Sequence, residues 1–170
     1  MTDNELREQL SLLKNGDKDA LCAIYDGLAP AIFTVALRIT RNRALAEDAV
    51  QELFVKLLKK PPEKIPQKPR AYIFSAARNA SLDTLRQNPA HEDIEEHTDI
   101  PAARHAEYTD VTEALYSLPE QQRSIVAMHI NAGLKFREIA EITGAPLGTV
   151  LWRYKKAIAA MRNILDGGKS

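Results

Sequence analysis

The chain has 170 residues, 45% hydrophobic and 27% charged, a composition close to the globular average and unlike that of disordered chains. Its single cysteine, Cys22, excludes an internal disulfide framework and a cysteine-rich zinc site; we expect a small, buried residue in a reducing compartment. The formal net charge is zero, the first residues are polar and acidic, and no uncharged apolar run approaches the length of a membrane span, which predicts a cytoplasmic protein.

The zero net charge hides a strong alternation along the chain. Segment 56–87 carries eight lysines and arginines against two acidic residues, whereas 88–110 carries one arginine against seven acidic residues. From residue 111 onward the balance is basic again. Two basic blocks separated by an acidic one suit a protein that contacts a polyanion at two places.

Helical periodicity runs through almost the whole chain, and no stretch shows the alternation of a β-strand, so the predicted fold class is all-α. Gly16 should end the first helix, while Gly27 and Pro30 should break or kink the second. Asn42 is expected to cap the helix that follows. The expected later helices are 43–59, 70–86, 111–117, 120–131, 136–143 and 147–165, with a stiff proline-rich loop at 61–69.

Segment 88–110 divides the chain into two expected domains. It is acidic, contains proline and has few large apolar residues, so it buries little surface and is predicted to be a flexible linker. The predicted architecture is therefore two small helical domains, 1–87 and 111–170, joined by this acidic linker. His91 and His97 in the linker are six residues apart rather than four, without an expected helix, so no metal site or cofactor is predicted.

Residues 136–150 have the spacing of a helix-turn-helix, with Gly144 four residues after Ala140 and Val150 six residues further on. A small alanine allows the two helices to cross closely, and glycine accepts the left-handed backbone of the turn. Val150 and Ile139 should fill the wedge between the helices. The C-terminal domain is therefore predicted to carry a helix-turn-helix.

The second helix of this motif has two unlike faces. On an ideal helix the inward stripe consists of Val150, Tyr154, Ala157 and Met161. The outward face has no acidic residue before Asp166 and comprises Trp152, Lys155, Lys156, Ala159 and Asn163, with Leu151, Arg153 and Arg162 beside them. Such a face suits a major groove, where Leu151 and Trp152 offer only apolar contacts, for instance to a thymine methyl. These two residues could instead contact a partner protein. An ordinary helical hairpin with solvated lysines is the alternative.

The chain resembles the extracytoplasmic-function (ECF) sigma factors of bacterial RNA polymerase in three blocks that cover nearly its whole length. The blocks are 24–54, which ends in Ala46-Glu-Asp-Ala-Val-Gln-Glu-Leu-Phe54; 70–86; and 118–150, which opens with Leu118-Pro-Glu-Gln-Gln-Arg-Ser-Ile-Val126. The resemblance implies that 1–87 binds core polymerase and the minus-ten promoter element, and that 111–170 binds the minus-thirty-five element. It further implies promoter melting, transcription initiation, control by an anti-sigma factor, and no small-molecule substrate, catalytic group or membrane insertion.

The resemblance also assigns site residues. The polymerase-binding candidates are Asp48, Gln51, Glu52 and Phe54. The minus-ten candidates are Lys64, Lys68, Arg70, Tyr72, Arg78, Asn79 and Arg86, with loop 61–69 and Asn79 forming a pocket for an extruded base. The minus-thirty-five candidates are Lys135, Arg137, Gly148, Thr149, Leu151, Trp152, Arg153, Lys155 and Lys156. For each group the alternative is that the residues have no binding role. In that case Phe54 and Tyr72 belong to the hydrophobic core, and the charged residues form a solvated surface.

The last block departs from the family pattern. Leu151 and Trp152 follow Gly148-Thr-Val150 where Lys or Arg and then Ser are usual, and Lys156-Ala-Ile158 stands where Arg-Ala-Arg is frequent. Fewer cationic contacts reduce both affinity for DNA and its salt dependence. The acidic linker either mimics RNA in the polymerase channel or is a solubilising tether.

Three other functions compete with this interpretation. A sigma-like decoy would bind an anti-sigma protein without reading DNA, which Leu151 and Trp152 favour and the basic segment 56–86 disfavours. A simple helix-turn-helix repressor leaves the first two blocks unexplained. An enzyme is disfavoured because the sequence has neither a glycine-rich phosphate loop nor a nucleophile motif.

Overall fold

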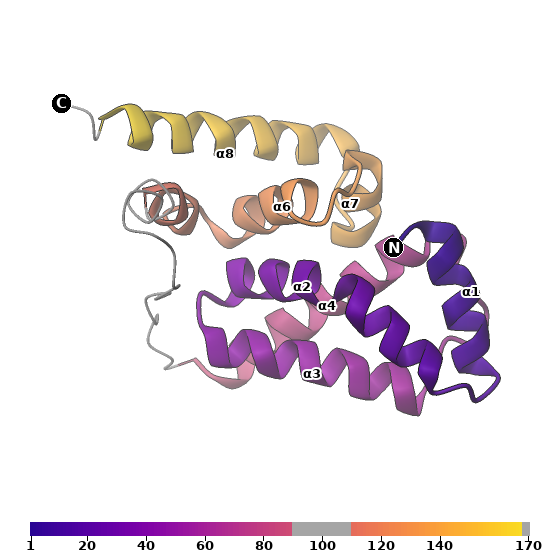
Figure 1. Ribbon diagram of the computed structural model, residues 1–170. Coiled ribbons are helices and arrows are strands. Elements are labelled where there is room, and N and C mark those ends of the chain that lie inside the picture. Colours follow the sequence, from indigo (N-terminus) through magenta and orange to yellow (C-terminus); the bar gives the residue numbers. More distant parts are fainter. Residues whose placement is uncertain (90–109, 168–170) are drawn as a thin grey trace.

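The computed structural model describes residues 1–89 and 110–167, which form helices and contain no strand. The helices are α1 (Asp3–Lys14), α2 (Asp19–Thr40), α3 (Arg43–Lys59), α4 (Pro69–Gln87), α6 (Glu120–Ile130), α7 (Phe136–Thr143) and α8 (Leu147–Gly167), with a further helical segment at 110–116. Figure 1 shows α1 to α4 as one bundle and α6 to α8 as a second layer beside α2. The predicted all-α class is confirmed.

Helix α2 continues through Gly27 and Pro30, so of the predicted break or kink at these residues the break does not occur. A proline inside a helix removes one backbone hydrogen bond and costs about 3 kcal/mol. Burial of eleven α2 side chains, against α1, α3, α4 and α6, offsets this cost. By length and composition α2 could cross a membrane, but its packing makes it the central core helix of the bundle.

Other helix ends follow the signals in the sequence. Gly16 and Gly144 adopt φ angles of +96° and +68°, in the left-handed region that favours glycine. The Asn42 side chain accepts a hydrogen bond of 3.1 Å from the backbone N–H of Leu45, which caps α3 as predicted.

Cys22 is exposed on α2, so the expectation of a buried cysteine is wrong. It lies two residues from buried Ala20 and two from buried Ile24. Two residues correspond to about 200° around a helix, which directs the thiol away from the buried face.

The C-terminal half packs directly on the N-terminal half: α6 contacts α2, and α7 contacts α4. One cluster of buried apolar side chains extends from Leu6 in α1 through Ile125 in α6 to Val150 in α8. Most of the predicted linker, including His91 and His97, lies outside the described residues.

Arg123 of α6 joins the two halves through the C-terminal end of α2. Its Nε donates to the carbonyl of Arg38 at 2.5 Å, and its Nη2 donates to the carbonyl of Ile39 at 3.3 Å. Its Nη1 donates to the carbonyl of Leu118 at 2.8 Å, just before α6. The last carbonyls of a helix have no partner within it and carry its negative dipole end, so a buried guanidinium is well placed there.

Candidate nucleic-acid interface

Helices α7 and α8 and the turn at Gly144 form the predicted helix-turn-helix. Ile139 of α7 and Val150 of α8 are fully buried between these helices and the rest of the core. Ala140 packs against the same cluster, as its small size predicted. The turn holds α8 so that one side of it faces solvent along its length.

The solvent-facing side of α8 is basic and carries one large apolar ring. Trp152 is 58% exposed, and the Lys156 ammonium lies 4.8 Å from the centroid of its ring, in a cation–π arrangement. The other exposed residues of this face are Gly148, Lys155, Ala159, Arg162 and Asn163, while Leu151, Arg153 and Thr149 are half-buried. Lys135 and Arg137 at the start of α7 are exposed as well. This face offers cations and a planar apolar group together.

A hollow of about 510 Å³ lies between α3 and α4. Its lining includes Tyr72, which is 38% exposed, and exposed Asn79, both of which the sequence assigned to base binding. Its volume is within the range of small-molecule sites, about 300–1,000 Å³. An aromatic ring beside an amide can stack on a base and bond to its edge.

The walls of this hollow differ from those expected. Its cations come from the end of α3, as Lys56, Lys59 and Lys60, and not from the proline-rich loop, which does not line it. Asp83 of α4 also lines it. The Glu52 carboxylate, 2.5 Å from the Lys56 ammonium, raises the pKa of Lys56 above its ordinary value by hydrogen bonding. Lys56 is thus charged near neutral pH. The lysines at the end of the predicted helix 43–59 were the feature of the sequence from which this cationic wall could have been predicted.

The remaining minus-ten candidates divide into two sets. Lys64 is exposed, and Arg86 is 73% exposed while paired with Asp83 at 2.8 Å. The other three are bound by the C-terminal half: Lys68 Nζ by Glu141 Oε1 at 2.6 Å, Arg70 Nη2 by the Ala132 carbonyl at 2.6 Å, and Arg78 Nη2 by Glu120 Oε1 at 4.0 Å. Arg70 also donates to the Met1 carbonyl at 2.7 Å. Lys64 and Arg86 are therefore open to solvent, whereas Lys68, Arg70 and Arg78 contact the C-terminal half.

A second, apolar groove of about 840 Å³ lies between α2 and α3. Gln51 lines it from an exposed position, and Phe54 lies at its base, 7% exposed, with its ring centroid 4.9 Å from that of Tyr25. Exposed apolar residues on its rim are Tyr25, Val55 and Leu58. Sequence reasoning missed these three, although 51, 54, 55 and 58 share one face of a helix.

The other two polymerase-binding candidates lie outside this groove. Asp48 is exposed on α3, and half-buried Glu52 is occupied by its ion pair with Lys56. The four candidates therefore separate into two groove residues and two acidic neighbours. No cluster of three or more potential metal-ligating side chains occurs among residues 1–89 and 110–167.

Comparison with known proteins places both halves in one family. Residues 24–90 match sigma-70 region 2, and residues 108–161 match sigma-70 region 4. The chain is 23% identical over 177 residues to the ECF RNA polymerase sigma factor SigK of Mycobacterium ulcerans, covering 96% of this chain and 95% of SigK. It is 29% identical over 157 residues to the ECF sigma factor SigL of Mycobacterium tuberculosis, covering 85% and 88% respectively.

Two solved structures share the fold. CnrH in complex with the cytosolic domain of CnrY has a TM-score of 0.76 and 21% identity, covering 96% of this chain and 98% of CnrH. The sigma factor RpoE, in complex with the anti-sigma factor NepR from Bartonella quintana, has a TM-score of 0.67 and 19% identity, covering 85% and 95%. The chain belongs to the ECF sigma factors, which confirms the resemblance seen in its three sequence blocks.

Proposed function

We propose that this chain binds core RNA polymerase, recognises and melts specific promoters, and thereby directs transcription initiation. The observation that carries the proposal is the pair of separate basic surfaces, the α3–α4 hollow and the outward face of α8, one in each sigma-matched region. Such a factor positions and opens DNA and performs no bond chemistry of its own, so it is not an enzyme. Its place of action is the cytoplasm, where the polymerase is.

Core polymerase is proposed to bind the groove between α2 and α3. Gln51 and Phe54 belong to this groove, and Tyr25, Val55 and Leu58 extend it as exposed apolar contacts. Asp48 and Glu52 beside it would form the polar rim that surrounds the apolar centre of most protein interfaces.

The minus-ten element is proposed to bind along α4. A base extruded from the duplex enters the α3–α4 hollow, stacks on Tyr72 and bonds to the Asn79 amide, which offsets the few kcal/mol needed to unstack it. The lysines at the end of α3 neutralise the adjoining phosphates. The phosphates of the same strand are proposed to be contacted by five further cations, Lys64, Lys68, Arg70, Arg78 and Arg86.

The minus-thirty-five element is proposed to bind the outward face of α8, with Lys135 and Arg137 on the backbone beside it. Lys155, Lys156 and Arg153 contact phosphates or guanine edges, and Trp152 contacts a thymine methyl. Gly148, Thr149 and Leu151 lie at the N-terminal end of α8, the end that enters the groove in helix-turn-helix proteins. The proposed domains are 1–87 and 111–170, with 88–110 as the linker between them.

An anti-sigma factor is proposed to hold the chain inactive, since the similar RpoE structure contains one. The exposed indole of Trp152 gives a specific reason to keep the decoy alternative, in which the α8 face binds a protein and not DNA. The two functions can be told apart because a decoy requires neither core polymerase nor promoter DNA.

The experiment that tests the proposal adds the purified chain to bacterial core polymerase and sheared genomic DNA, and sequences the 5′ ends of the RNA. We expect co-elution with core on gel filtration and 5′ ends at a small set of positions that share upstream sequence. A chain that does not bind core but binds an anti-sigma protein tightly would support the decoy instead.

A further inference from the structure

We propose that Asp83 makes the hollow between α3 and α4 select a base by its amino group. The hollow accepts cytosine and adenine, whose Watson–Crick edges carry an amino group beside an unprotonated ring nitrogen. It rejects guanine and thymine, which carry a carbonyl in place of that amino group. This inference rests on the proposed entry of an extruded minus-ten base into the hollow, and it adds the residue that selects the base.

Asp83 is an unexpected residue in a surface that binds DNA. Among the described residues it is the one acidic side chain that lines the hollow, together with the ammonium groups of Lys56, Lys59 and Lys60. A carboxylate close to the phosphate backbone weakens binding, because like charges repel. The three lysines offset that cost, so the carboxylate serves contact with a base and not with the backbone.

The Asp83 carboxylate has acceptor capacity left for a ligand. Its Oδ1 accepts a hydrogen bond of 2.8 Å from Arg86 Nη1, and the Asp83 side chain is 44% exposed. A carboxylate has about four acceptor positions, and within the described part of the chain Oδ2 accepts no hydrogen bond. The ion pair with Arg86 therefore occupies one oxygen and leaves the other available to a base.

Asn79 lies one helical turn before Asp83 on the same face of α4. Residues four apart on a helix are neighbours, with Cβ atoms about 5–6 Å from each other. Both side chains line the hollow, as do those of Ala76 and Ala80 on the same face. The small alanine side chains leave room for a planar ring, so a base in the hollow meets an amide and a carboxylate side by side.

This pair of groups matches one of the two kinds of base edge. The Asp83 carboxylate accepts from the amino group of cytosine or adenine, while the Asn79 amide nitrogen donates to the adjacent ring nitrogen. Guanine and thymine have the reverse pattern, a carbonyl oxygen beside a ring N–H. Their carbonyl faces the carboxylate, so two acceptors lose water without gaining a hydrogen bond, which disfavours binding.

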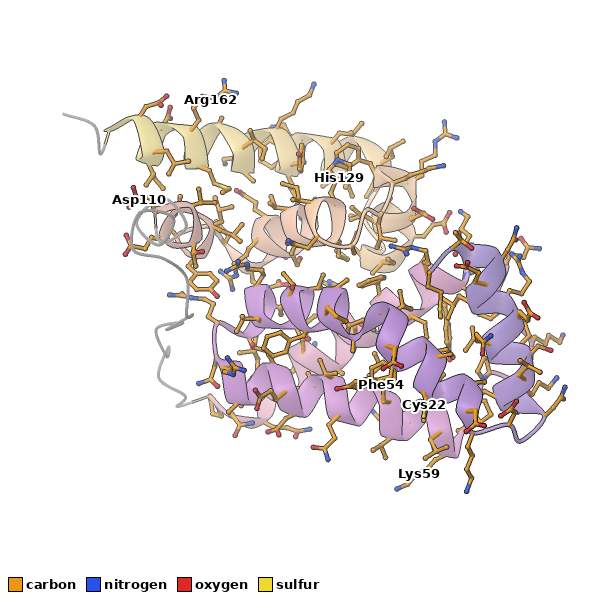
Figure 2. All side chains as sticks on the ribbon, in the orientation of Figure 1. Cys22, Phe54, Lys59, Asp110, His129 and Arg162 are labelled. Carbon is orange, nitrogen blue, oxygen red and sulfur yellow. The ribbon has the colours of Figure 1, made fainter. Side chains whose placement is uncertain are left out.

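The hollow lies far from the other proposed DNA surface. Figure 2 shows Lys59, one of the residues that line it, on the side of the N-terminal bundle opposite α8, where Arg162 is labelled. Base selection in the hollow can therefore be measured separately from contacts with the minus-thirty-five duplex. A set of promoters that differ in one minus-ten base reports on the N-terminal half alone.

The test measures binding of the full-length chain with core polymerase to a fluorescein-labelled promoter duplex, by fluorescence anisotropy. The minus-ten segment is held open by mismatches, and each of its bases is replaced in turn by the other three. We expect one position at which cytosine or adenine binds at least tenfold more tightly than guanine or thymine. The reason is that a hydrogen bond to a charged acceptor is gained with the first two and an acceptor is left unsatisfied with the others.

Removal of the amino group alone tests Asp83 directly. 2-Pyrimidinone is cytosine without its amino group, and unsubstituted purine is adenine without it. At the selected position this replacement should weaken binding by the unchanged chain roughly tenfold, and binding by Asp83→Asn less than threefold, because the variant has already lost the charged acceptor. The matched control, Glu63→Gln, removes the same charge from an exposed position of the proline-rich loop outside the hollow and should keep the full discrimination.

Three results overturn the inference: no position that prefers an amino base, a preference for guanine or thymine that depends on Asp83, or an equal loss in the unchanged chain and in Asp83→Asn when the amino group is removed. Run-off transcription from the unmodified promoter tests the proposed function separately. Transcription without an Asp83-dependent base preference refutes only the role of Asp83. The absence of transcription refutes the proposed function, and this inference with it.

Discussion

Replacing Arg123 by methionine should strongly destabilise the chain and uncouple its two halves. The Arg123 guanidinium is 7% exposed and donates to three carbonyls, those of Arg38, Ile39 and Leu118. Methionine keeps much of the side-chain volume but donates no hydrogen bond. Two of the three carbonyls belong to the last turn of α2 and would lose a buried partner.

The magnitude follows from these contacts. A hydrogen bond from a charged donor contributes about 1.5–3 kcal/mol, and removing one partner of a buried charged contact typically costs about 3–5 kcal/mol in total. We therefore expect the free energy of unfolding to fall by about 3–5 kcal/mol, a large share of the roughly 5–15 kcal/mol of an ordinary domain.

Urea denaturation followed by circular dichroism at 222 nm measures this loss. With an m-value of about 2.5–3 kcal/mol/M, the midpoint should fall by about 1–2 M, and two transitions should replace one if the halves come apart. Arg137→Met, at an exposed position of α7, is the control and should change stability by less than about 0.5 kcal/mol. A loss below 1 kcal/mol for Arg123→Met would refute the view that this residue joins the halves.

Three further predictions concern the proposed contact surfaces. Val55→Glu, on the rim of the apolar groove, should weaken binding to core polymerase at least tenfold in a competition assay. An equal effect of Lys18→Glu, outside the groove, would contradict the proposal that polymerase binds there. Asn79→Ala should reduce permanganate reactivity of promoter thymines without changing duplex binding upstream; unchanged melting would remove Asn79 from the base pocket. Replacing the thymine that contacts Trp152 by deoxyuridine removes its methyl group. Binding by the holoenzyme with the unchanged chain should weaken roughly fourfold, since a buried methyl contributes about 0.8 kcal/mol. Binding by the holoenzyme with Trp152→Ala should not change. Equal losses in both would show that the indole does not contact that methyl.

Local signals predicted the elements of the fold well. Gly144, Ala140 and Val150 specify the helix-turn-helix because their sizes and backbone preferences act within the motif itself. A break or a kink was expected at Pro30, and the break does not occur because the cost of the proline is local, whereas the burial that offsets it comes from four other helices. Periodicity alone does not reveal that balance.

Contacts between the halves could not be predicted in this way. Lys68 and Glu141 are 73 positions apart, and nothing in either segment indicates the other. The same holds for Arg123, whose partners at the end of α2 are backbone carbonyls with no sequence signature. The proposed base pocket is intermediate, because Tyr72 and Asn79 on α4 were candidates from the sequence, while the lysines of the α3–α4 hollow belong to the end of α3 and were not.

The chain is proposed to give core polymerase the ability to start at a promoter. The most direct measurement is run-off transcription from one linear duplex promoter fragment by core polymerase, with and without the purified chain. We predict a single RNA of defined length that appears only when the chain is present and disappears when the minus-ten or minus-thirty-five sequence is scrambled. The absence of such an RNA, or an RNA that still forms when either sequence is scrambled, would contradict this function.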